Sequence, residues 1–137
     1  MEQRLSLLTL AVADVARSRA FYVDGLGWEP LLESPGVLMI PVADRLLLSL
    51  WSAEEFTEEV GERPAAGVPP ITLAHNVATE AEADAVLAEA AALGATVQPG
   101  RRRVWGGYSG YFVDPDGFRW EIAVNPGVIG DVVLPPD

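Results

Sequence analysis

The sequence predicts an α+β fold of two tandem βαβββ modules, whose strands form a curved mixed sheet around a cavity. The same order of expected elements occurs twice along the chain. Two short segments also recur: Thr9-Leu10-Ala11 returns as Thr72-Leu73-Ala74, and Leu26-Gly27 returns as Leu93-Gly94. The 137 residues, half of them apolar, are enough to bury one core, so residues 1–137 are expected to form a single domain.

The first module is predicted at about residues 4–52. Its first strand is expected to be buried on both faces, because its residues are almost all apolar. Asp14 can cap the helix that follows, and Gly25 can end that helix in the left-handed conformation. Three short strands separated by turn residues complete the module. In chain order, the five elements are predicted at residues 5–12, 15–23, 28–33, 37–42 and 45–51.

An acidic connection is predicted at about residues 53–68, with one helical turn near residues 54–59. The second module follows at about residues 69–126. Thr79 and Glu82 have the spacing of a capping box, which predicts a second helix that Gly94 ends. The strands of this module are predicted at residues 71–77, 96–98, 108–113 and 118–124, with a tight turn at 114–117 and a C-terminal tail at 127–137.

Charge and composition exclude several classes of partner. Nine Lys and Arg against 20 Asp and Glu give a net charge of -11, which would repel a nucleic-acid backbone. The same charge favours cationic ligands, although an acidic surface is also a common means of solubility. With no cysteine, the chain has no disulfides and no thiolate sites. Because no secretory signal or membrane-spanning segment is evident, we expect a cytoplasmic protein that does not bind membranes.

Two motifs carry a family resemblance. The segment ADVARSRAFY at residues 13–22, followed by Gly25-Leu26-Gly27-Trp28, resembles the first-helix signature of the vicinal oxygen chelate superfamily. The segment YFVDPDGFRWE at residues 111–121 resembles its closing hairpin. The match covers the chain to about Pro126. It implies the fold of glyoxalases, bleomycin resistance proteins and extradiol dioxygenases, which supplies a cavity but does not specify a reaction.

The resemblance also implies four metal-binding positions, one on each of four strands, usually occupied by His, Glu or Gln. Here they fall at Leu7, near Leu48, at Pro70 or Thr72, and at Glu121. Only Glu121 offers a strong ligand, and one carboxylate cannot hold a divalent ion that requires four to six donors. We therefore expect no catalytic metal and no cofactor.

Four aromatic residues and one carboxylate are the candidate ligand-binding groups. Trp51, Trp105, Tyr108 and Tyr111 are expected to form a stacking wall, of which two reach the cavity, while a purely core role is the alternative. Glu121 is the expected polar anchor, unless it forms a salt bridge with Arg119 or another nearby arginine.

Two further features remain open in function. The cluster Arg101-Arg102-Arg103 forms either a solvated loop or an anion-binding group that faces the cavity. The single histidine, His75, alternates with Ile71 and Leu73 along its strand. We therefore expect His75 to face the helix side as a hydrogen-bonded structural residue.

These observations favour a metal-independent protein that binds a small planar or cationic organic molecule in the concave face between the modules. One alternative is an enzyme, a lyase, isomerase or dioxygenase with a degenerate or displaced site, whose catalytic residues the sequence does not identify. A second alternative is a regulatory or interaction module without a small ligand. A homodimer is expected, because the family commonly pairs subunits and because apolar strand edges favour pairing.

Overall fold

Helices and strands occur in the same order in the two halves of the chain. The computed structural model describes residues 1–135 and forms two units, of which the first ends at Gly67 and the second begins at Val68. The first unit contains β1 (Leu7–Val12), α1 (Val15–Arg19), η1 (Ala20–Gly25), β2 (Leu32–Ser34), β3 (Val37–Ala43), β4 (Leu46–Ser52) and α2 (Ala53–Val60). The second contains β5 (Thr72–Asn76), α3 (Glu80–Ala92), β6 (Thr96–Arg102), β7 (Tyr108–Val113), β8 (Arg119–Val124) and α4 (Gly127–Val133).

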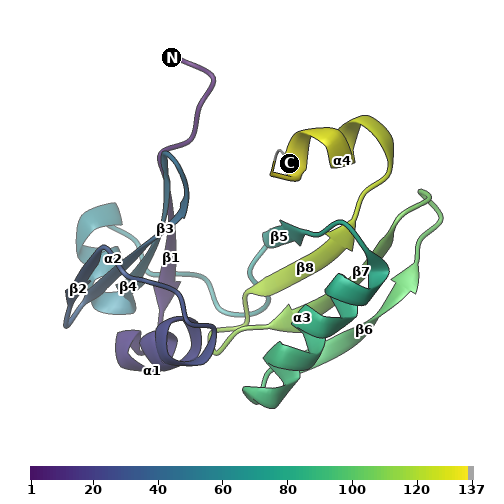
Figure 1. Cartoon of the computed structure of the whole chain (residues 1–137). Helices are drawn as coiled ribbons and strands as arrows, with labels where there is room; N and C mark the ends of the chain where they lie inside the picture. The colour runs from purple at the N-terminus through teal and green to yellow at the C-terminus, as the bar shows by residue number, and fades with distance from the viewer. Residues whose placement is uncertain (136–137) are drawn as a thin grey trace. The chain divides into compact units, whose positions relative to one another are not determined.

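The two sheets have equivalent strand orders. The order is β1-β4-β3-β2 in the first unit and β5-β8-β7-β6 in the second (Figure 1). In each, the first strand pairs in parallel with the last, and the other pairs are antiparallel. The prediction of two βαβββ modules in an α+β fold is therefore confirmed.

The core of the first unit lies between its sheet and α1. Leu38 and Leu50 are Cα partners that are almost fully buried, and α1 contacts both of their strands. Because successive strand residues point to opposite faces, Val37 and Trp51 lie on the other face of the same sheet. In each unit, we call the sheet face opposite the core helix, which is α1 in the first unit and α3 in the second, the open face. The helix α2, which contacts β1 and β4, covers part of it without burying any of its own side chains.

The core of the second unit lies between its sheet and α3, which runs across β6, β7 and β8 (Figure 1). Phe112 and Trp120 are buried on the helix side with their rings stacked 6.0 Å apart. Gly110 allows α3 to approach closely, since a Cβ at that position would lie 2.5 Å from Cδ1 of Leu87. The predicted capping box is confirmed at the start of α3, where Thr79 and Glu82 satisfy each other's backbone amides.

The end of the first helix differs from the prediction. Gly25 does not take the left-handed conformation; the helix continues as the π-helical segment η1, in which the Leu26 amide donates to the Phe21 carbonyl. Gly27, with φ of 74°, makes the turn instead. The Trp28 amide then donates to the Tyr22 carbonyl, and the two rings lie 5.4 Å apart. Because this amide caps the helix, the strand predicted from residue 28 begins only at Leu32.

Three other elements are longer than predicted. The strand expected to end at Gln98 continues to Arg102, because a register shift between Gln98 and Arg101 accommodates Pro99 and Gly100. The helical turn expected in the acidic connection is the eight-residue helix α2, and the expected tail begins with α4. In the described part of the chain, every helix is too short or too polar to cross a bilayer.

Candidate functional site

Tyr111 and Glu121 lie side by side on the open face of the second sheet. Glu121 is the Cα partner of Tyr111 on β7 and of Ala74 on β5, so the three side chains point to one face. Ser109, two residues before Tyr111, lies on the same face. The sheet thus brings together two of the five predicted site residues.

Arg103 belongs to the same cluster. Its Nε donates to the Ser109 hydroxyl over 2.9 Å, and its Nη2 donates to the Ser109 carbonyl over 2.9 Å. Its guanidinium carbon lies 5.7 Å from the centroid of the Tyr111 ring. Within residues 1–135, Glu121 forms no ion pair with any of the arginines. Arg103, Tyr111 and Glu121, with Ser109, are called the open-face cluster below.

The other two arginines of the basic run have a different role. Arg101 and Arg102 are exposed on β6, and Arg102 pairs with Glu80 of α3 over 3.0 Å. Each of the two alternatives left open by the sequence therefore applies to part of the run: Arg101 and Arg102 face solvent, although on a strand and not in a loop, whereas Arg103 lies with the open-face residues. Two arginines extend a strand, and one turns onto the open face.

The environment of Tyr111 changes its acidity. Burial raises the pKa of Tyr111, and its hydrogen bond to the Glu121 carboxylate raises it further, whereas the charge of Arg103 acts in the opposite direction. Tyr111 is therefore a neutral hydrogen-bond donor at physiological pH. The carboxylate of Glu121 keeps further lone pairs with which it can accept hydrogen bonds from another molecule.

Tyr108 does not belong to this cluster, which corrects the sequence-based expectation. Its hydroxyl donates to Oδ1 of Asp84 on α3 over 2.6 Å, and this bond raises the pKa of Tyr108. Tyr108 and Tyr111 are three residues apart on one strand, and such residues point to opposite faces. That spacing was visible in the sequence, so it is a signal that the expectation overlooked.

Trp105 lies at the edge of the open face of the second sheet. It is 46% exposed and belongs to the turn that the Arg103 amide closes by donating to the Gly107 carbonyl. A Cβ at Gly107 would lie 1.7 Å from Cζ3 of Trp105, so the indole covers the side of Gly107 where a side chain would project. By strand alternation, that side is the face of Ser109 and Tyr111.

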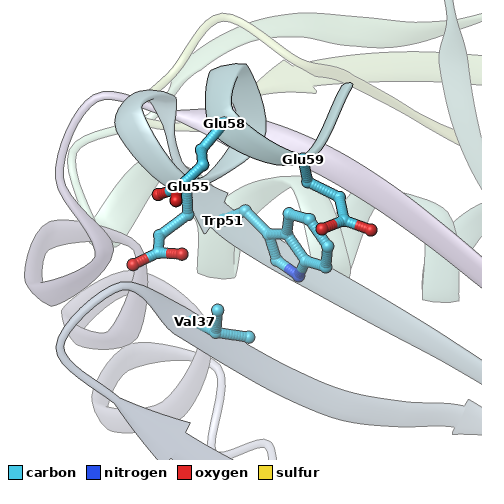
Figure 2. A pocket seen from close by; sticks show the side chains of 5 residues that line it. All are labelled: Val37, Trp51, Glu55, Glu58 and Glu59. Atoms are coloured by element: carbon cyan, nitrogen blue, oxygen red, sulfur yellow. The ribbon is translucent and has the colours of Figure 1, made fainter. Parts of the chain in front are cut away.

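Trp51 belongs to the first unit, whereas the residues of the open-face cluster belong to the second. It lines a pocket of about 300 Å³ together with Val37 and three carboxylates of α2, those of Glu55, Glu58 and Glu59 (Figure 2). The sequence analysis did not identify these glutamates as site residues. Their spacing within the acidic connection, which places all three on one side of a helix, was the available signal.

His75 shares its face with Leu73 and with its Cα partner Ile122, both of which are buried on the α3 side. The expectation that His75 faces the helix side is confirmed. Its side chain is exposed, and its position excludes it from the open-face cluster.

The residues at the implied metal positions do not fit a divalent ion. Leu48 is buried on the helix side and is not on the open face, which corrects its placement at the second position. The repeat shows the equivalent residue: Ala11 pairs with Trp51 as Ala74 pairs with Glu121, so Trp51 occupies the position that Glu121 has in the second module. Neither indole nor alanine offers a metal ligand. Residues 1–135 contain no group of three His, Cys, Asp or Glu that could hold a metal ion.

Comparisons with known proteins agree with this fold. The model of the Glyoxalase/Bleomycin resistance protein/Dioxygenase superfamily matches residues 4–122. No curated protein matches the chain.

Three solved structures illustrate the likeness. A glyoxalase-related enzyme from Fulvimarina pelagi is 32% identical, with a TM-score of 0.83 over 91% of this chain and 90% of that chain. A glyoxalase/bleomycin resistance protein/dioxygenase from Nocardioides is 24% identical, with a TM-score of 0.76 over 93% and 89%. Lactoylglutathione lyase from Agrobacterium tumefaciens is 23% identical, with a TM-score of 0.72 over 90% and 95%. The last two likenesses concern the fold alone.

Proposed function

The chain belongs to the glyoxalase/bleomycin resistance protein/dioxygenase superfamily, and from this premise we propose that it binds a small planar or cationic organic molecule without a metal. One observation carries the proposal. Glu121 has an alanine and a tyrosine beside it on the open face, where a metal site would need further ligands. The open-face cluster instead offers a carboxylate, a phenol and a guanidinium, which suit direct recognition of an organic compound.

The chemistry of the cluster defines the ligand class. Trp105 presents a partly exposed indole on which a flat ring can stack, and Glu121 can accept a hydrogen bond from an ammonium or another N–H group. Stacking or a cation–π contact contributes about 1 kcal/mol, and a charge-assisted hydrogen bond contributes about 1.5 to 3 kcal/mol. These two terms sum to about 2.5 to 4 kcal/mol, which corresponds to a dissociation constant of about 1 mM or weaker before the cost of ordering is subtracted.

Calorimetric titration with two matched flat compounds tests the proposal. We expect protonated aminoquinoline to bind more tightly than naphthol, which is equally flat but uncharged. Glu121→Gln should weaken aminoquinoline binding roughly tenfold or more and leave naphthol binding nearly unchanged. Trp105→Ala should weaken both compounds about fivefold.

Glu89→Gln is the control, since it removes the same charge from an exposed position of α3. If the parent protein bound neither compound, or if the Glu121 and Trp105 variants bound both as tightly as the parent, the proposed site would be rejected.

A metal-free lyase or isomerase is the second candidate. It is favoured by the glyoxalase-related enzyme at 32% identity and by the adjacent proton donor and acceptor, Tyr111 and Glu121. This candidate requires turnover of a hydroxyketone or hemithioacetal by chelator-treated protein, with loss of turnover in Glu121→Gln. Binding without turnover favours the first candidate.

A further inference from the structure

We propose that the first unit contains a second binding site, which takes an organic cation that also carries an uncharged oxygen acceptor. The site is the pocket between Trp51 and α2, which we call the Trp51 pocket (Figure 2). All of its lining residues belong to the first unit. The pocket therefore contains no residue of the open-face cluster, and binding there does not require the function proposed for that cluster.

The three carboxylates of the pocket lack a counter-charge. Glu55, Glu58 and Glu59 hang from α2 on the side of Trp51 in Figure 2, and none of them forms an ion pair within the described residues. Glu58 and Glu59 lie in the last turn of α2, where the helix dipole disfavours negative charge, and that turn contains no basic residue. Repulsion at this spacing also destabilises the helix. A bound cation would relieve both effects.

The dimensions and the lining point to an organic cation. Among the described residues, no group of three His, Cys, Asp or Glu could hold a metal ion, and this includes the three glutamates of the pocket. They instead surround a volume of about 300 Å³ together with an indole and the side chain of Val37. An indole attracts cations through its ring face, and methylated ammonium groups bind to such faces.

An orphan donor is the independent observation that indicates a ligand. The Nε1 of Trp51 is buried and has no hydrogen-bond partner among residues 1–135, and the same holds for the Oγ of Ser49, two residues earlier on the same face of β4. Buried donors without partners are rare in folded proteins. Because Trp51 lines the pocket, an acceptor that satisfies its N–H would come from an occupant. That acceptor is uncharged, since a ligand carboxylate would be repelled by the three glutamates.

The helix α2 can admit such an acceptor. None of its side chains is buried, so α2 can shift without disrupting a core. Gly36 helps to place Glu55 in the pocket, because a Cβ at Gly36 would lie 2.7 Å from Cγ of Glu55. The Ser52 amide donates to the Gly36 carbonyl over 2.8 Å and fixes this glycine next to the start of α2.

Calorimetric titration with choline and propyltrimethylammonium tests the inference. The two cations have the same shape, but only choline carries an oxygen. We expect the parent to bind both, with choline about fivefold tighter because of the Trp51 N–H. Trp51→Phe, which keeps an aromatic ring but removes the N–H, should abolish the preference and retain binding. Glu58→Gln and Glu59→Gln should each weaken both cations about twofold to fivefold.

Glu54→Gln is the matched control, because it removes the same charge from the same helix but does not line the pocket. Its affinity for both cations should equal that of the parent. Failure of the parent to bind either cation at millimolar concentration would overturn the site, whatever the aminoquinoline titration shows. Equal losses for Glu54→Gln and Glu58→Gln would overturn it too, and a choline preference that survives in Trp51→Phe would overturn the acceptor assignment. Circular dichroism of each variant verifies that the fold is intact.

Discussion

Tyr111 is the residue that joins the open-face cluster, since its ring lies 5.7 Å from the guanidinium carbon of Arg103 and its hydroxyl is hydrogen-bonded to Glu121. Sequence reasoning found Tyr111 and Glu121 because both lie in the recognisable closing hairpin and share a face across one turn. It left open whether Arg103 faces solvent or the cavity, because that choice depends on its partner Ser109, which lies six residues further along the chain. It included Tyr108 although strand alternation places that residue opposite Tyr111.

The raised pKa of Tyr111 predicts a loss of stability in alkali. The folded state favours the protonated phenol, so this contribution is fully present below the ordinary tyrosine pKa of about 10 and is lost as the pH rises through the higher folded value. Urea unfolding from pH 8 to pH 11 should show a steeper decline for the parent than for Tyr111→Phe. Identical slopes in the two proteins would contradict the burial and hydrogen bonding described for this phenol.

At the scale of elements, the sequence predicted those helix and strand ends that depend on neighbouring residues alone. The capping box of α3 and the strands β7 and β8 are close to their predicted bounds because caps and turn residues mark their ends. The π-helical segment and the bulge of β6 were not predictable in this way. The π-helical segment depends on how Tyr22 and Trp28 pack against each other. In β6, Pro99 and Gly100 are typical of a strand end, although the strand continues past them through a register shift.

Thr79→Ala tests how much the capping box contributes to α3. The substitution removes the acceptor of the Glu82 amide and one half of the reciprocal pair. We expect a loss of about 1 kcal/mol in the free energy of unfolding, measured with urea. Thr79→Ser should retain most of the stability, because a serine hydroxyl can accept the same bond. A Thr79→Ala variant as stable as the parent would show that tertiary packing alone maintains the helix.

At the scale of the whole molecule, the duplication shows which residue of the first module corresponds to Glu121 in the second. Equivalent strand pairs place Trp51 in the first module where Glu121 lies in the second, so an aromatic side chain and a carboxylate occupy corresponding positions. The sequence analysis assigned the implied second position to Leu48, which alternation directs to the core. The homodimer stays a prediction, for which sedimentation is the direct measurement.

Metal-independent binding is the central claim, and one titration tests it most directly. Aminoquinoline is titrated into protein purified without chelator and into the same protein after dialysis against EDTA, with elemental analysis of both samples. We predict equal dissociation constants and no stoichiometric transition metal in either sample, because Glu121 is flanked by Ala74 and Tyr111 on the open face. A stoichiometric metal in the untreated protein, together with loss of binding after EDTA and its recovery on adding the metal back, would contradict the account.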